Sequence, residues 1–211
     1  MEKTVTSMPI KKTLTDYLRL WFKWFLDPLG GFFNRLGITP NAMTMLGLLG
    51  NAVGAYYLAR GEMLTGGIFV LLMTPIDALD GTMARLRGES GDFGAFVDSV
   101  IDRYSELIIY GGLLYYFLSQ GETLGGLLVF GAAAGSVLVS YVKARAEALG
   151  YEAKIGLLTR VERYIVLAPS LVFRQPLIGL AIIAVFANIT ALQRIWHVRA
   201  QAHAKMKKQE L

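Results

Sequence analysis

The stretch that decides the fold, DALDGTMARLRGESGDFGAFVDSVID, runs from residue 77 to residue 102. It contains six acidic side chains, although it lies in a chain that is otherwise strongly apolar. Four of these acids fall where hydrophobic helices are expected: Asp77, Asp80, Asp98 and Asp102. Because acids inside membrane helices are costly, they mark functional sites. Their arrangement is therefore the best guide to what the chain does.

The composition of the chain is typical of a membrane protein. Hydrophobic residues make up 54% of the 211 residues and charged residues 18%, against roughly 25% charged residues in soluble domains. The chain has no cysteine, and its only two histidines, His197 and His203, lie near the C-terminal end. Disulfides, thiolate metal sites, histidine zinc sites and a Ser-His-Asp triad are therefore not expected. The first residues lack the apolar core of a signal peptide, so we expect insertion through internal spans.

Six apolar stretches are candidates for transmembrane helices. A spanning helix needs roughly 20 mostly apolar residues, and turn-forming sequences separate the six stretches. The expected spans are 41–60, 63–86, 93–119, 123–146, 159–174 and 177–198, of which the fifth is the shortest. The sequence therefore predicts an all-α integral membrane protein with six transmembrane helices.

An amphipathic segment, TDYLRLWFKWFLDPLGGFFNRLG, precedes the first span and mixes Trp and Phe with Lys, Arg and Asp. This composition favours a helix that lies flat among lipid headgroups; a helix packed on the bundle is the alternative. We expect residues 1–40 to form a cytoplasmic N-terminus and this interfacial helix. Residues 41–200 would form the six-helix catalytic domain, and residues 201–211 a basic cytoplasmic tail.

The basic residues predict the orientation in the membrane. With the N-terminus in the cytoplasm, the outer loops hold only Arg60 and Arg174, and the other 19 of the 21 Lys and Arg residues lie on or near the cytoplasmic side. The net charge of +5 is then a topology signal and an attraction for anionic lipid, so nucleic-acid binding is not needed to explain it. We expect a multi-pass protein of the cell membrane, with both termini and the active site on the cytoplasmic side.

The spacing of the four acids predicts a metal site. Asp77 and Asp80 are three residues apart, and Asp98 and Asp102 four, so each pair occupies one helix face. The short connection between the two helices predicts antiparallel neighbours whose acids face each other. Four such carboxylates would repel one another without a cation. Oxygen ligands favour two Mg²⁺ or Mn²⁺ ions, with Ca²⁺ as an alternative; a single acid could instead pair with a basic residue or line a water-filled path.

The whole pattern resembles a family signature. The CDP-alcohol phosphotransferase family is matched at every signature position by Asp77-x2-Asp80-Gly81-x2-Ala84-Arg85-x8-Gly94-x3-Asp98-x3-Asp102. The stretch ITPNAMT at 38–44 and the six-helix pattern extend the resemblance over nearly the whole chain. The resemblance implies transfer of a phosphatidyl group from a CDP-linked lipid, CDP-diacylglycerol, to an alcohol with release of CMP. It also implies a homodimer.

The resemblance assigns roles to individual residues. Asp77, Asp80 and Asp98 would hold the metal ions. Asp102 would act as the base toward the acceptor hydroxyl and would also touch a metal. The positions that border the CDP group would be Gly81, Arg85, Gly94, Asn41 and Thr44.

Basic residues at the inner ends of the later spans predict a phosphorylated acceptor. They are Lys143, Arg145, Arg160, Arg163 and Arg194. Such a cluster can bind phosphate through charge-assisted hydrogen bonds, and the positive-inside rule alone is the alternative explanation. Lys143, Arg163 and Arg194 resemble the phosphate-binding residues of prokaryotic phosphatidylinositol phosphate synthases, which implies inositol 1-phosphate as acceptor. Glycerol 3-phosphate, used by phosphatidylglycerophosphate synthases, is the alternative, although DSVIDR departs from their pattern.

Two other classes of protein stay open. A divalent-cation channel or transporter would also place acids in helices, but broken helices near the bilayer midplane would be more typical. A catalytically silent assembly protein is disfavoured by the intact signature. Glu106 continues the helix face of Asp102, and we interpret it as an ion-pair partner of Arg103 or another neighbour.

Overall fold

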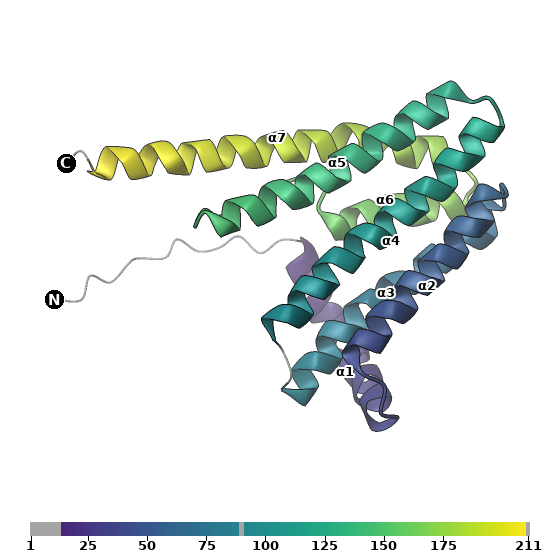
Figure 1. Cartoon of the computed structure of the whole chain (residues 1–211), viewed down its shortest axis with the longest axis horizontal. Coiled ribbons are helices and arrows are strands. Elements are labelled where there is room, and N and C mark those ends of the chain that lie inside the picture. Colours follow the sequence, from purple (N-terminus) through teal and green to yellow (C-terminus); the bar gives the residue numbers. More distant parts are fainter. Residues whose placement is uncertain (1–13, 89–90, 210–211) are drawn as a thin grey trace.

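The structure is a computed structural model that describes residues 14–88 and 91–209, with side chains for residues 24–76, 79–88 and 91–207. The helices are α1 (Leu14–Arg35), α2 (Pro40–Ala59), α3 (Met63–Arg87), α4 (Asp92–Ser119), α5 (Thr123–Ala148), α6 (Arg160–Val172) and α7 (Pro176–Gln209) (Figure 1). Within the described ranges the chain contains helices and connections but no strand. The all-α prediction is confirmed for this part of the chain.

Local sequence signals account for the helix ends near the acids. Helix α2 begins at Pro40, where a missing N–H costs nothing, and the Thr39 side chain accepts a hydrogen bond from the Ala42 N–H at 3.2 Å. Helix α3 ends at Gly88, whose φ of 69° is a left-handed conformation that glycine adopts without strain. These caps fix the cytoplasm-facing ends proposed below.

Four helices, α2, α3, α5 and α7, are long and apolar enough to cross a membrane, judged over the described residues. Helix α4 has 28 residues, but its first half carries Asp98, Asp102, Arg103 and Glu106. Helix α6 has only 13 residues, about 20 Å at 1.5 Å per residue, which is short of the roughly 30 Å hydrocarbon core. Each predicted span corresponds to one helix, but length and composition support membrane crossing for four of them.

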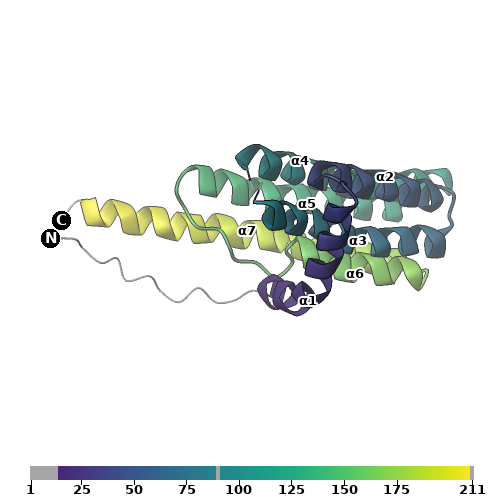
Figure 2. The ribbon, with the colours of Figure 1, turned by 90° about the horizontal axis from the view of Figure 1, so that it is seen from below.

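Helix α2 packs closely against both α3 and α4, and Figure 2 shows α2 beside α4 in one layer and α3 beside α6 in the other. An added Cβ at Gly112 of α4 would lie 2.3 Å from the Ala55 carbonyl oxygen, and one at Gly66 of α3 would lie 2.9 Å from the Gly54 carbonyl oxygen. These glycines allow the backbones to approach.

Helices α3 and α4 contact each other only slightly, although residues 88–91 alone separate them in the sequence. The expectation that they pack as direct antiparallel neighbours is therefore wrong. The physical reason is that glycine contacts let α2 approach both α3 and α4 closely, so α2 is the packing partner of each.

Helix α1 runs across one end of the bundle at a steep inclination to the other helices (Figure 2). It is fixed to α3 because Asn34 donates a hydrogen bond to the Met83 carbonyl at 3.2 Å and accepts one from Arg87 Nε at 2.7 Å. Trp24 and Phe32 are exposed on its surface. Helix α1 thus covers the end of α3 that carries the acids.

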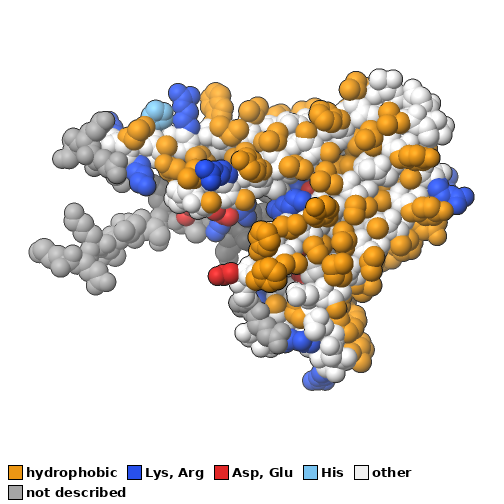
Figure 3. Space-filling view, viewed as in Figure 1, with side chains coloured by type: hydrophobic (Ala, Val, Ile, Leu, Met, Phe, Trp, Pro, Cys, Tyr) orange, Lys and Arg blue, Asp and Glu red, His pale blue; other side chains and the backbone are white. Residues whose placement is uncertain are grey.

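The outer surface of the bundle is strongly apolar. Figure 3 shows hydrophobic side chains spread over the visible face of the helices, with Lys and Arg at its margins, along the C-terminal half of α7 and in a small patch near its middle. Large exposed side chains such as Leu49, Leu127 and Phe130 belong to this surface. An apolar surface of this extent is typical of contact with lipid.

Candidate functional site

The acids lie at the end of the bundle where α3 finishes and α4 begins. Asp80 is seven residues before the end of α3, and Asp98 is six residues after the start of α4. At 1.5 Å per residue both lie about 10 Å from the helix ends. The two helices therefore place their acids at similar depth, as the sequence predicts.

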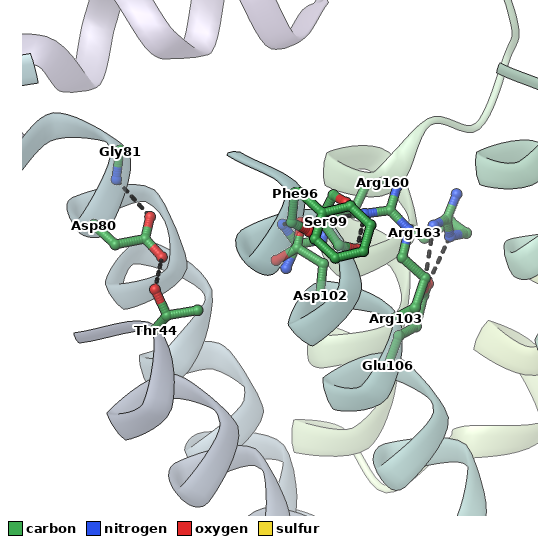
Figure 4. Close-up of polar contacts among 10 residues, drawn as sticks. All are labelled: Thr44, Asp80, Gly81, Phe96, Ser99, Asp102, Arg103, Glu106, Arg160 and Arg163. Atoms are coloured by element: carbon green, nitrogen blue, oxygen red, sulfur yellow. Dashed lines mark hydrogen bonds and ion pairs between the residues drawn. The ribbon is translucent and has the colours of Figure 1, made fainter. Parts of the chain in front are cut away.

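Asp80 is held between α3 and α2. Its side chain is buried, its Oδ2 accepts a hydrogen bond from Thr44 Oγ1 at 2.7 Å, and its Oδ1 accepts one from the Gly81 N–H at 2.5 Å (Figure 4). An added Cβ at Gly81 would meet only Arg85 Nη1, at 3.6 Å. Thr44, a predicted CDP-binding residue, thus contacts a predicted metal ligand, and the face of Gly81 is open.

Asp102 is paired with basic residues rather than left alone. It is buried, and its Oδ2 lies 2.5 Å from Arg160 Nη1 of α6 and 3.6 Å from Arg103 Nη1 of its own helix (Figure 4). Asp98 is half-buried one turn earlier on α4. The structure therefore places a predicted acceptor-binding arginine directly on the predicted base.

The described carboxylates do not converge into a closed metal site. Within the described residues no three Asp, Glu or His side chains gather as metal ligands would, and the Asp77 side chain lies outside the described residues. The donor set nevertheless fits a hard divalent cation in its chemistry, because the available ligands are carboxylate and hydroxyl oxygens from Asp80, Asp98, Asp102 and Thr44.

The other predicted CDP-binding residues lie on the accessible side of the same helix ends. Asn41, Arg85 and Gly94 are exposed. Arg85 donates a hydrogen bond from Nη2 to Thr82 Oγ1 at 2.8 Å, and an added Cβ at Gly94 would meet no atom within 4 Å. These positions leave room for a ligand above Asp80.

Two of the predicted acceptor-binding residues come together at the start of α6. Arg160 contacts Asp102, whereas Arg163 is 1% exposed and forms a bidentate ion pair with Glu106 of α4, with Nε–Oε1 and Nη2–Oε2 distances of 2.7 and 3.0 Å. Helices α4 and α6 therefore bring two acids, Asp102 and Glu106, and the guanidinium groups of Arg160 and Arg163 to one place (Figure 4).

The remaining predicted acceptor-binding residues are arranged differently. Arg194 is buried and donates hydrogen bonds to the carbonyl groups of Val139 (2.6 Å) and Ile155 (2.8 Å). Arg145 is exposed, and Lys143 lies 3.9 Å from Glu147 one turn along α5. Arg194 thus fastens the connection before α6 to α5 and α7.

Two charged residues at this place were not predicted as site residues. Arg103 interacts electrostatically with Asp102, Glu106, Arg160 and Arg163. Glu106 has Arg163 as its partner, where the sequence left Arg103 or another neighbour open. The signal in the sequence was their helical spacing from Asp102, which shows a shared face but cannot reveal that α6 supplies the partner.

Comparison with known proteins gives a consistent result. Residues 37–193 match the model of the CDP-alcohol phosphatidyltransferase family. A phosphatidylinositol phosphate synthase of Streptomyces avermitilis is 34% identical, over 91% of this chain and 85% of its own length. An archaetidylinositol phosphate synthase of Pyrococcus horikoshii is also 34% identical, over 82% of this chain and 90% of its own length.

A solved relative shares the fold. The phosphatidylinositol phosphate synthase of Mycobacterium tuberculosis with CDP-DAG bound has a TM-score of 0.75 at 31% identity, covering 82% of this chain and 92% of the other. The same protein in complex with manganese and citrate has a TM-score of 0.76 at 30% identity, covering 82% and 88%. The chain therefore belongs to the CDP-alcohol phosphatidyltransferase family and is a phosphotransferase.

Proposed function

We propose that the enzyme transfers a phosphatidyl group from CDP-diacylglycerol to inositol 1-phosphate, giving phosphatidylinositol phosphate and CMP. The observation that carries the proposal is the position of Arg160 and Arg163 beside Asp102. Guanidinium groups bind phosphate well, and a base next to them can receive the proton of a hydroxyl on the same molecule. The names of the relatives support this acceptor.

The donor would bind on the α2–α3 side of the site. We infer that its CDP group lies along Gly81, Arg85 and Gly94, with Asn41 and Thr44 at the start of α2. The exposed Arg85 guanidinium suits the diphosphate, and the open face of Gly81 gives it room. The solved relative with CDP-DAG bound supports this class of donor.

The metal ligands would be Asp77, Asp80, Asp98 and Asp102. We propose two divalent ions, Mg²⁺ or Mn²⁺; the manganese in the solved relative supports the choice of metal. When bound, such ions neutralise the charge that develops on the diphosphate. Thr44 would hold Asp80 in place through its hydrogen bond at 2.7 Å.

The chain's own residues would carry the proton and the acceptor. The acceptor hydroxyl oxygen forms a bond to the phosphorus next to diacylglycerol, the bond from that phosphorus to CMP breaks, and Asp102 receives the hydroxyl proton. Arg160, which contacts Asp102, would orient the carboxylate. When the acceptor binds, the Arg160 guanidinium would turn to contact the acceptor phosphate. We place Lys143, Arg145 and Arg194 in the basic surroundings of this phosphate, farther from the reacting atoms.

We also propose that α2–α7 all cross the membrane, with α1 in the headgroup layer and with both termini and the site on the cytoplasmic side. The apolar outer surface (Figure 3) and the separation of basic residues support this arrangement. The acids then lie about 10–15 Å below the cytoplasmic ends of their helices, where lipid tails stay in the bilayer and cytidine stays in water. The resemblance to the family supports a homodimer.

The test is CMP release by the purified enzyme in detergent or liposomes, with CDP-diacylglycerol, Mn²⁺ and a panel of acceptors. We expect turnover with inositol 1-phosphate and much less with glycerol 3-phosphate, free inositol or serine. Faster turnover with glycerol 3-phosphate would make that compound, rather than inositol 1-phosphate, the acceptor. Ion flux without CMP release from any acceptor would overturn the proposal.

A further inference from the structure

Glu106 and Arg163 form a buried ion pair between α4 and α6. The two residues are 6% and 1% exposed, and two parallel hydrogen bonds, from Nε to Oε1 and from Nη2 to Oε2, join them (Figure 4). Paired contacts of this kind fix the plane of a guanidinium group. The free-energy cost of removing two charges from water offsets most of the attraction between them. Such a pair therefore adds little stability compared with apolar side chains. Its presence therefore calls for a role other than stability.

The contact with Glu106 leaves one edge of the Arg163 guanidinium available. A guanidinium group has five N–H donors in a planar fork, and Glu106 uses one from Nε and one from Nη2. The remaining nitrogen, Nη1, is buried and has no hydrogen-bond partner among the described residues. A buried charged donor without an acceptor is unfavourable. An oxygen of a bound ligand at this edge would satisfy it.

The guanidinium group of Arg163 favours an anion as that ligand. Arg103 and Arg194 both interact electrostatically with Arg163, and Arg103 also interacts with Arg160. The acids Asp102 and Glu106 pair with this group, and Glu147 and Glu162 interact with Arg194. These acids do not reach Nη1 of Arg163, whose positively charged N–H donors are left without an acceptor among the described residues and suit a phosphate oxygen.

We propose that Glu106 is a positioning residue that acts through Arg163. It fixes the guanidinium so that the Nη1 edge meets the phosphate of the acceptor alcohol. Glu106 touches neither substrate nor the reacting atoms. This inference rests on the proposed function, since it assumes a phosphorylated acceptor, but it does not depend on which alcohol carries the phosphate.

The first test is Glu106→Gln, which preserves size and removes the charge. The KM for inositol 1-phosphate should rise tenfold or more, in the range of about 10- to 100-fold typical of residues that orient a ligand-binding group, while the KM for CDP-diacylglycerol stays unchanged. Glu106→Asp keeps the charge and shortens the side chain, so its acceptor KM should fall between wild type and Glu106→Gln. Equal rises in both KM values, or no rise in the acceptor KM, would overturn the inference.

A double variant tests whether Glu106 acts through Arg163. In Glu106→Gln/Arg163→Gln the acceptor KM should equal that of Arg163→Gln alone, because the positioned group is already absent. A further tenfold rise in the double variant would contradict the proposed route. Inorganic phosphate provides a second probe: its inhibition constant against the acceptor should rise in Glu106→Gln in proportion to the acceptor KM, and an unchanged constant would contradict phosphate binding at Arg163.

The matched control is Ser136→Ala, which removes the buried 3.1 Å hydrogen bond between Tyr110 of α4 and Ser136 of α5. It should leave both KM values unchanged. If Glu106→Gln does not give a monodisperse protein in gel filtration, Glu106→Asp decides: a selective rise in the acceptor KM supports the inference and an unchanged value overturns it. Wild-type enzyme that turns over no phosphorylated acceptor would instead overturn the proposed function itself.

Discussion

At the scale of single residues, Asp102 is proposed both to bind metal and to act as the base toward the acceptor. It belongs to the acidic set of α3 and α4, and it also contacts Arg160 at 2.5 Å. The pairing holds the carboxylate where the acceptor phosphate is expected. As the proposed base, Asp102 would lie close both to the proposed metal ligands and to the arginines proposed to bind the acceptor.

We therefore predict that Asp102→Asn lowers kcat for CMP release by at least about 100-fold, the usual contribution of a general base. Asp92→Asn is the matched control, because Asp92 is an exposed acid on the same helix, outside the site. The control should keep wild-type activity, and both variants should remain monodisperse. Wild-type turnover in Asp102→Asn would exclude this residue as the base.

At the scale of the helices, the site depends on α2 holding α3 and α4 in fixed positions. The closest approach to backbone lies between Gly112 of α4 and the Ala55 carbonyl of α2, where an added Cβ would lie 2.3 Å from the carbonyl oxygen. Backbone atoms cannot move aside as a flexible side chain can, so any larger residue must push the two helices apart.

Gly112→Ala should therefore destabilise the protein by about 1–3 kcal/mol, the usual cost of overpacking, and lower its melting temperature in detergent. Gly111→Ala is the control, because an added Cβ at Gly111 meets nothing within 4 Å. Equal melting temperatures for the two variants would show that the α2–α4 contact is looser than described here.

The positions of the helices along the chain could largely be predicted from the sequence. The expected span 41–60 corresponds to α2 at Pro40–Ala59, and 123–146 to α5 at Thr123–Ala148, because apolar length and glycine-containing turns determine where helices stop. The partner of each helix could not be predicted. Periodicity shows which residues share a face, but the choice of α2 over α4 as the neighbour of α3 depends on glycine contacts between distant segments.

The same limit applies to the site. The spacing of Asp98 and Asp102 placed them on one face of α4, and Thr44 was assigned to the donor side, where it contacts Asp80. By contrast, Lys143 and Arg163 look alike in sequence, yet Lys143 is partly exposed beside Glu147 on α5 and Arg163 is buried beside Glu106. Which basic residues converge depends on where the bundle places α4 and α6 relative to each other, and no local pattern encodes it.

At the scale of the whole molecule, the absence of cysteine from the sequence makes the proposed orientation directly measurable. Gln120 follows α4 at the end opposite the acids, and Lys154 lies between α5 and α6 at the other end; both are exposed. Single cysteines at these positions report the two sides of the membrane.

A membrane-impermeant maleimide applied to intact cells should label Gln120→Cys, and it should label Lys154→Cys only after permeabilisation. Cysteine-free wild-type protein is the blank. Labelling in the reverse order would place the acids on the outer side and contradict the distribution of charges described above.

Residues of α4 and α6 together would bind the phosphate of an acceptor whose hydroxyl then receives the phosphatidyl group. This is tested by comparing inositol 1-phosphate with free inositol in CMP release by the purified enzyme, at saturating CDP-diacylglycerol and Mn²⁺. The phosphorylated acceptor should have a kcat/KM at least about 100-fold higher, because free inositol lacks two or more charge-assisted hydrogen bonds. Equal kcat/KM for the two acceptors would show that the arginines do not bind the acceptor phosphate.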